Sequence, residues 1–273
     1  MDIYYKDYLS YSAHGFHLKV WRENFERDFL EICCQGPSCE RILFSPVSSS
    51  QFARVFSFEY QGQKYFHKTF LSRNWLDRLK DIFRRSRAER ALRGHLLLQE
   101  NGFCAPRINV VGRKGSNNFV VSQAGRKVKI LHQLLRQMSD SDSPEEQYPL
   151  RKEFVRQLGH TVGKLHYLGI SHGDLRSGNI IIDTSDAGRL RCFFLDNERT
   201  VCYRKLPQHK RLKNLVQLNM IPESFVAKSD RLRFFKAYLQ ENPDLALQKK
   251  WLTRIVKKTQ KRLLRKTREK ISK

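Results

Sequence analysis

The 273-residue sequence has no run of about 18 apolar residues, which is the length that a membrane-spanning helix requires. The first 20 residues lack the charged start and apolar middle of a signal peptide, so we expect the protein to stay in the cytosol. Six cysteines fit that compartment as reduced thiols. No two of them form a C-x-x-C pair, and the cluster Cys33, Cys34 and Cys39 has no second half to complete a zinc site.

Acidic residues are scarce, because 27 Asp and Glu stand against 52 Lys and Arg, which gives a net charge of +25. Hydrophobic residues make up 40% of the chain, which is enough for a core and argues against a disordered protein. The basic excess is strongest in residues 249–273, where 12 basic residues accompany one acidic residue. Such a charge predicts attraction to nucleic acid, an anionic membrane or a phosphorylated substrate, without choosing among them.

The first half of the chain after residue 45 is patterned mainly as strands. Residues 52–70 alternate in the strand manner on either side of Gln61-Gly62, which predicts a hairpin. Residues 86–101 carry apolar side chains four apart and end at Asn-Gly, which predicts a helix. Two further strands are expected over 107–112 and 118–122. These elements predict a small β-rich lobe with one main helix.

The second half is patterned mainly as helices. Residues 139–149 are polar and turn-rich, which predicts a loop. A strong helix follows, and two β runs over 180–183 and 191–195 come after it. The helix places four apolar side chains on one face: Phe154, Leu158, Val162 and Leu165. We therefore expect four segments: an N-terminal extension over 1–45 with a helix near 21–33, an N-lobe over 46–122, a C-lobe over 123–248, and a basic amphipathic helix over 249–273.

The segment that carries chemistry is residues 172–179, which read HGDLRSGN, together with Asp196. Phosphoryl transfer needs a carboxylate to orient the attacking hydroxyl, and Mg²⁺ on the ATP phosphates needs oxygen ligands. A loop presents Asp174 and Asn179 five residues apart, and a hairpin over 180–195 would bring Asp196 back to the same point. The order H-x-D-x-x-x-x-N followed by a metal-binding Asp is that of a kinase catalytic loop.

The version H-G-D-L-x-x-x-N with the following Leu-Asp-Asn-Glu at 195–198 resembles the lipopolysaccharide kinase family, the Kdo/heptose kinases of Gram-negative bacteria. The resemblance covers roughly residues 50–245, and RLKNLVQLN at 211–219 is similar to the C-terminal lobe of that family. It implies an α+β, protein-kinase-like fold with two lobes. It also implies an ATP-dependent and Mg²⁺-dependent kinase that phosphorylates a sugar hydroxyl, of Kdo or heptose, in the lipopolysaccharide inner core.

The resemblance assigns roles to matching residues of the second half. Asp174 resembles the catalytic base, and Arg176 lies where kinases often place a cation near the γ-phosphate. Asn179 and Asp196 resemble the Mg²⁺ ligands, and His172 resembles the histidine that holds the loop. The alternative for Arg176 is a solvated surface charge.

A kinase also needs a strand Lys on the ATP phosphates and a helix Glu that orients it. Lys68 ends a strand-like run and Glu89 lies 21 residues later in the predicted helix, so this pair fits in order and element type. Lys64 is the alternative lysine, and Glu89 is alternatively a surface partner of Arg85 or Arg93.

The sequence departs from conventional kinases at several points. No G-x-G-x-x-G precedes Lys68, so Ser48, Ser49 and Ser50 would have to let the backbone approach the phosphates. The usual Asp-Phe-Gly is replaced by Asp-Asn-Glu at 196–198, and no Ala-Pro-Glu follows. The missing activation segment argues against a conventional protein kinase.

The expected partners follow from the resemblance and from the charge. A lipopolysaccharide core or lipid A precursor is the expected acceptor, and the basic segments 73–93 and 249–273 suit the anionic cytoplasmic face of the inner membrane. The alternative for 73–93 is a solvated helix face, and the alternative for 249–273 is that its apolar side, with Trp251, packs on the C-lobe. Two alternatives stay open: an atypical Ser/Thr or other small-molecule kinase, and a catalytically silent kinase-like module that binds anionic membrane or RNA. No aromatic-basic RNA-recognition signature is present, so nucleic acid is not expected as a partner.

Overall fold

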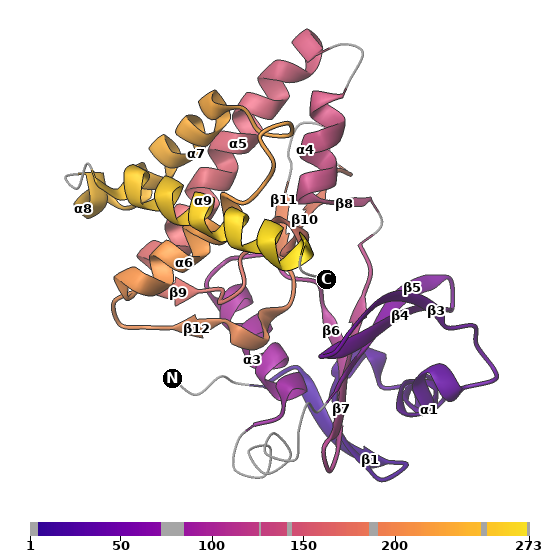
Figure 1. Cartoon of the computed structure of the whole chain (residues 1–273). Helices are drawn as coiled ribbons and strands as arrows, with labels where there is room; N and C mark the ends of the chain where they lie inside the picture. The colour runs from indigo at the N-terminus through magenta and orange to yellow at the C-terminus, as the bar shows by residue number, and fades with distance from the viewer. Residues whose placement is uncertain are drawn as a thin grey trace. The chain divides into compact units, whose positions relative to one another are not determined.

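The computed structural model divides the chain into two compact units, residues 1–126 and 127–273 (Figure 1). Part of the predicted basic stretch 73–93, residues 73–84, lies outside the described residues. The structure describes residues 5–71, 85–125, 127–140, 144–185, 191–246 and 250–271.

The first unit is built on a seven-stranded antiparallel sheet with the strand order β1-β2-β6-β7-β5-β4-β3 (Figure 1). Its elements are β1 (Tyr8–Ala13), β2 (Phe16–Trp21), α1 (Arg27–Gln35), β3 (Ser45–Ser50), β4 (Ala53–Tyr60), β5 (Gln63–Phe70), α3 (Arg87–Glu100), β6 (Ile108–Lys114) and β7 (Asn117–Gln123).

Two tight turns fix the hairpins of this sheet. Gln61 and Gly62 both have positive φ, of 49° and 72°, as a two-residue type I′ turn requires, and the hairpin predicted over 52–70 is confirmed. His14 and Gly15 repeat this geometry between β1 and β2, with φ of 51° and 76°. The segment 1–45, expected to be an extension, thus supplies two strands to the sheet. The expected helix near 21–33 begins later, at Arg27, because Phe16–Trp21 pairs with β1 and β6.

The two faces of the sheet carry separate apolar clusters. One face packs against α1, whose Phe29 and Leu30 are each 1% exposed. The other face packs against α3, whose Ala88 and Leu92 are fully buried. The predicted helix over 86–101 is confirmed, and Ser86 caps it by accepting a hydrogen bond from the Glu89 backbone N–H at 3.1 Å.

The second unit is mostly helical, as expected. Its long helix begins earlier than predicted, because proline is tolerated in a first helical turn and the polar residues that follow it are good helix formers. The part of 139–149 from residue 144 onward is therefore helix rather than loop. Its elements are β8 (Val128–Ile130), α4 (Leu131–Ser139), α5 (Pro144–Tyr167), β9 (Ile170–Ser171), β10 (Ile180–Asp183), β11 (Arg191–Phe194), β12 (Val201–Cys202), α6 (Gln208–Leu218), α7 (Lys228–Glu241), α8 (Pro243–Ala246) and α9 (Lys250–Ile271).

Helices α5 and α7 pack against each other along an extensive contact within the described residues. The four apolar residues predicted to share a face of α5 are all buried. Two glycines lie at the crossing, because a Cβ on Gly159 would come 2.4 Å from the Phe234 carbonyl oxygen and one on Gly163 would come 2.7 Å from the Glu241 Cβ. Small residues at these positions let the two backbones approach closely.

The predicted basic amphipathic helix is α9, which packs against α6 (Figure 1). Trp251 is 1% exposed and Ile255 is 5% exposed, so the apolar side is anchored within the unit. Thr259 continues this side and accepts a hydrogen bond from the Asn219 amide at 3.0 Å. Most of the basic side chains lie on the opposite, exposed side. No helix in the described ranges is long and apolar enough to cross a membrane.

Candidate active site

Two paired strands and a buried histidine fix the start of the loop 172–179. It follows β9, which pairs with β12. His172 is fully buried, and its Nε2 donates to the Leu195 carbonyl at 2.9 Å, since a carbonyl only accepts. Burial lowers the pKa of His172, so the ring is neutral and holds the loop against the end of β11. The holding role predicted for His172 agrees with this geometry.

The glycine of the H-G-D sequence is required by the backbone. Gly173 has φ of +76°, and a Cβ there would lie 2.5 Å from the Arg199 carbonyl oxygen. Lys213 on α6 also donates to the Gly173 carbonyl at 2.6 Å. The loop therefore turns sharply at this point against two other segments, which sets the direction of Asp174.

Replacing Gly173 by alanine should lower the free energy of unfolding by about 1–2 kcal/mol, because a side chain at positive φ is strained. The clash with the Arg199 backbone, which must also move, adds to this loss. Gly178→Ala is the matched control in the same loop, since no atom lies within 4 Å of a Cβ there and its φ is not left-handed. Urea unfolding of both variants measures the effect. Equal stabilities would contradict the strain argument.

Three side chains donate to the Asp174 carboxylate. Oδ1 accepts from Arg176 Nε at 2.8 Å and from Gln217 Nε2 at 2.6 Å, and Oδ2 accepts from Asn179 Nδ2 at 3.2 Å. The same Asn179 amide also donates to the Asp174 carbonyl at 2.9 Å. Asp174 is thus held in one orientation, and the structure brings it together with Arg176 and Asn179 as the sequence predicted.

The predicted hairpin returns the chain to this loop. Strands β10 and β11 are antiparallel, with Ile180 opposite Phe194, and the Leu195 N–H donates to the Asn179 carbonyl at 2.8 Å. Asp196 follows directly in a left-handed conformation, with φ of 58° and ψ of 52°. Asp196 and Asn179 therefore lie at the same end of the hairpin.

This donor set fits Mg²⁺. The Asn179 amide nitrogen is committed to Asp174, so its oxygen is the atom left to face a cation, and Asp196 adds a carboxylate. Within the described ranges, no three His, Cys, Asp or Glu side chains gather as a metal cluster. A site with one carboxylate and one amide is typical of Mg²⁺ that shares its coordination with substrate phosphates and water.

Two further residues contact this loop and were not predicted from the sequence. Gln217 donates to Asp174, and Lys213 holds the Gly173 carbonyl; both come from α6. Burial, followed by the nearby positive charges of Arg199 and Lys210, lowers the pKa of Lys213. The only signal was the segment 211–219, which the resemblance singled out without giving its side chains a role.

The strand lysine and helix glutamate predicted together lie in the first unit. Lys68 on β5 pairs with Val120 of β7, which belongs to the cluster beneath α3, so Lys68 is on the sheet face that α3 covers. Glu89 in the first turn of α3 forms ion pairs with Lys19 at 3.6 Å and with Arg85 at 3.8 Å. Within the described residues no ion pair joins Glu89 to Lys68, and the Arg85 contact is the alternative that helical spacing had suggested.

The three predicted phosphate-loop serines lie on β3, which is exposed along its whole length. Ser48 and Ser49 pair with Val55 and Arg54 of β4. Ser50 closes the turn to β4, because its hydroxyl accepts from the Phe52 and Ala53 N–H groups at 3.2 Å each. A strand–turn–strand with exposed residues thus precedes Lys68 in place of a glycine-rich loop.

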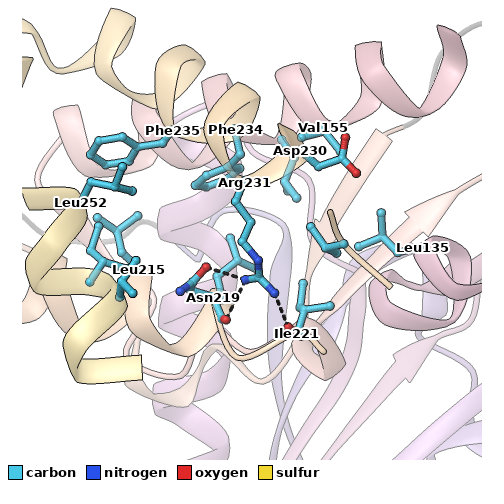
Figure 2. Close-up of a pocket in the computed structure, with 15 residues that line it drawn as sticks. Leu135, Val155, Leu215, Asn219, Ile221, Asp230, Arg231, Phe234, Phe235 and Leu252 are labelled. Atoms are coloured by element: carbon cyan, nitrogen blue, oxygen red, sulfur yellow. Dashed lines mark hydrogen bonds between the residues drawn. The ribbon is translucent and has the colours of Figure 1, made fainter. Parts of the chain in front are cut away.

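An apolar pocket of about 100 Å³ lies elsewhere in the second unit (Figure 2). Helices α4, α5, α6, α7 and α9 all contribute to its lining, and Arg231 borders it while donating to the Asn219 and Ile221 carbonyls. It contains none of the residues that the sequence predicted for the site. Figure 2 labels Leu135, Val155, Leu215, Phe234, Phe235 and Leu252 among its lining residues.

Residues 45–238, more than two thirds of the chain, match the model of the lipopolysaccharide kinase (Kdo/WaaP) family. The chain belongs to this family. Within it, the chain is 30% identical over 103 residues to a 3-deoxy-D-manno-octulosonic acid kinase of Haemophilus influenzae (strain PittEE). That stretch covers 38% of this chain and only 40% of the length of the relative.

A solved structure described as WaaP in complex with acyl carrier protein is similar to this lipopolysaccharide kinase family member over 87% of this chain and 93% of that chain. The TM-score is 0.60 and the sequence identity is 20%, so the likeness concerns the fold. The α+β, kinase-like fold predicted from the sequence is confirmed.

Proposed function

We propose that the chain is an ATP-dependent kinase that phosphorylates a sugar hydroxyl, of Kdo or heptose, in the lipopolysaccharide inner core. One observation carries this proposal. Asp174 is held by three donors on a loop whose Asn179 meets the start of the β10–β11 hairpin, with Asp196 at the hairpin's end. Family membership selects the core sugar as the acceptor over a protein or an unrelated small molecule.

The chemistry follows from the contacts of Asp174. The acceptor hydroxyl donates to this carboxylate, its oxygen attacks the γ-phosphorus of ATP, and the bond from that phosphorus to the β–γ bridging oxygen breaks. The hydroxyl proton passes to Asp174 and ADP leaves. Arg176, whose side chain is 55% exposed, is free to turn from Asp174 toward the transferred phosphoryl group. Asn179 and Asp196 would hold Mg²⁺, which supplies charge neutralisation on the phosphates when bound.

Residues of the first unit have proposed roles toward ATP as well. We propose that Lys68 binds the ATP phosphates and that the backbone around Ser48, Ser49 and Ser50 approaches them. For Glu89 the proposed role is to orient Lys68, which requires it to leave Lys19 and Arg85. Both of those ion pairs are partly exposed and therefore weak enough to exchange.

The test is transfer of label from γ-labelled ATP, with Mg²⁺, to lipopolysaccharide precursors from a host that lacks core phosphate. Label in the glycolipid supports the sugar-kinase proposal. Label in protein or in small molecules instead favours the atypical kinase. No transfer to any acceptor, with no binding of ATP, overturns both kinase proposals and leaves a silent module that binds anionic membrane or RNA.

We also propose that α9 holds the protein on the anionic face of the inner membrane. Its apolar side is anchored on α6, so its basic side chains remain exposed. Each basic residue near anionic lipid contributes about 1 kcal/mol. Replacing the exposed Lys257, Lys258 and Lys261 by glutamine should therefore lower the affinity for phosphatidylglycerol vesicles, measured by co-sedimentation, by about 100-fold. Binding to neutral vesicles is the control, and unchanged binding to anionic vesicles would contradict the proposal.

The solved neighbour suggests a protein partner as well. We propose that this chain binds an acyl carrier protein, and that the apolar pocket in Figure 2 receives the end of its acyl chain. Most of the side chains that border the pocket are hydrocarbon, which favours such a group over a polar one. Fluorescence titration with acylated and unacylated carrier protein tests this. Equal affinity for the two forms would contradict a role for the pocket.

A further inference from the structure

A continuous chain of hydrogen-bonded polar side chains runs from Arg211 on α6 to the Asp174 carboxylate. It links three helices, α5, α6 and α7, in the core of the second unit. Its members Tyr238, His166, Asn214 and Gln217 are at most 3% exposed. Successive contacts are Arg211 Nη1 to Tyr238 Oη at 2.6 Å, Tyr238 Oη to His166 Nδ1 at 3.0 Å, His166 Nε2 to Asn214 Oδ1 at 3.2 Å, Asn214 Nδ2 to Gln217 Oε1 at 3.2 Å, and Gln217 Nε2 to Asp174 Oδ1 at 2.6 Å.

Every hydrogen bond in this chain points the same way. Arg211 only donates, so the Tyr238 oxygen accepts from it and its hydroxyl proton is directed to His166 Nδ1. The Asn214 oxygen only accepts, so His166 carries its proton on Nε2. Burial, followed by the charge of Arg211, lowers the pKa of His166 to about 3, which agrees with a neutral ring that accepts at one nitrogen and donates at the other.

The last amide of the chain has one permitted orientation. Gln217 Oε1 accepts from the Leu175 backbone N–H at 3.2 Å as well as from Asn214. The amide nitrogen must then face Asp174, at 2.6 Å. A hydrogen-bond chain that starts at a guanidinium and ends at a carboxylate polarises each of its members in the same sense.

The two Asp174 carboxylate oxygens differ in how many hydrogen bonds they accept. Oδ1 accepts two hydrogen bonds, from Arg176 and Gln217, which fills its two lone pairs. Oδ2 accepts one, the longer bond from Asn179, and keeps a lone pair. Arg176 is largely exposed, so Gln217 is the buried donor that holds this arrangement when Arg176 turns away.

We infer that Gln217 is a positioning residue, which fixes the Asp174 carboxylate so that Oδ2 receives the proton of the acceptor hydroxyl. This inference rests on the proposed kinase function of Asp174. It gives the α6 segment 211–219 a task, because residues spaced three apart on one face of this helix, at 211, 214 and 217, all belong to the chain of contacts.

The test compares two substitutions at one position. Gln217→Glu keeps the side-chain length and the acceptor for Leu175 and Asn214, but it loses the donor to Asp174 and places a second carboxylate beside it. Gln217→Met keeps the length and loses both functions. We expect kcat for phosphoryl transfer to fall about 10- to 100-fold in each, with the KM for ATP within twofold of wild type. Gln208→Glu, at the exposed start of α6, is the control and should leave kcat unchanged.

Coupling to Asp174 separates positioning from a merely structural role. In an Asp174→Asn background, Gln217→Glu should cause no further loss of the residual rate, because its effect acts through the carboxylate. The inference is overturned if Gln217→Glu keeps kcat within twofold, or if its loss of kcat persists undiminished in that background. If Gln217→Glu does not fold, Gln217→Met carries the same comparison. Absence of transfer by the wild-type chain would instead refute the proposed function itself.

Discussion

Asp174→Asn is expected to lower kcat about 10³-fold while leaving the fold intact. Asparagine has nearly the same size, and its oxygen still accepts from Arg176 or Gln217. It cannot take the proton of the acceptor hydroxyl, and a positioned base contributes about 10²- to 10⁴-fold to such a step. Steady-state transfer from labelled ATP to the glycolipid measures kcat, and thermal unfolding shows whether the variant folds.

Asp183→Asn is the control for this substitution. Asp183 ends β10 in the same hairpin. Within the described residues, its carboxylate accepts hydrogen bonds only from Ser185. We expect this variant to keep kcat within twofold of wild type. An Asp174→Asn protein that folds and retains more than a tenth of the wild-type kcat would mean that another group accepts the proton.

Acidification from pH 7 to pH 5 is expected to destabilise both units strongly. Burial lowers the pKa of His67 to about 4 and that of His95 to about 4, with Arg107 adding to the effect at His95. In the second unit, burial and Arg211 lower the pKa of His166 to about 3. A histidine in the unfolded chain has a pKa near 6.5. Below that pH the unfolded chain therefore binds protons at these positions and the folded chain does not.

The stability that these histidines contribute is therefore complete above pH 6.5 and is lost as the pH falls toward 4, and toward 3 for His166. Each should remove about 2 kcal/mol between pH 7 and pH 5, so the first unit loses on the order of 4 kcal/mol. Urea unfolding at pH 5, 6 and 7 measures this change. His95→Gln should flatten the pH dependence and the exposed His209→Gln should not. A free energy of unfolding that is constant from pH 7 to pH 5 would contradict the expectation.

Sequence reasoning succeeded where local pattern and local chemistry coincide. The β4–β5 hairpin has both strand alternation and a Gln-Gly turn of the required positive φ. Helix α3 has its apolar spacing and the Ser86 cap. Asp174 and Asn179 meet because they lie five positions apart in one loop, and the β10–β11 pattern accounts for the return of the chain toward Asp196.

It failed where the signal was weaker or was not local. Strands β1 and β2 pair around His14-Gly15, a turn that was detectable, but the sequence analysis expected only one helix in an extension over 1–45. Helix α5 begins at a proline within a polar stretch, so composition favoured a loop. The contact between Gln217 and Asp174 spans 43 positions and depends on how α6 packs, which no single segment specifies.

The strand order of the first unit determines how far the protein can be shortened. The family match begins at residue 45, but the sheet runs on through β2 and β1, which lie beyond β6. A gene fragment for 45–238 would turn the buried β6 into a bare edge strand and remove α1 from the cluster around Phe58. An unpaired apolar edge recruits further strands, so such a fragment should accumulate in inclusion bodies, whereas the full chain has this edge covered.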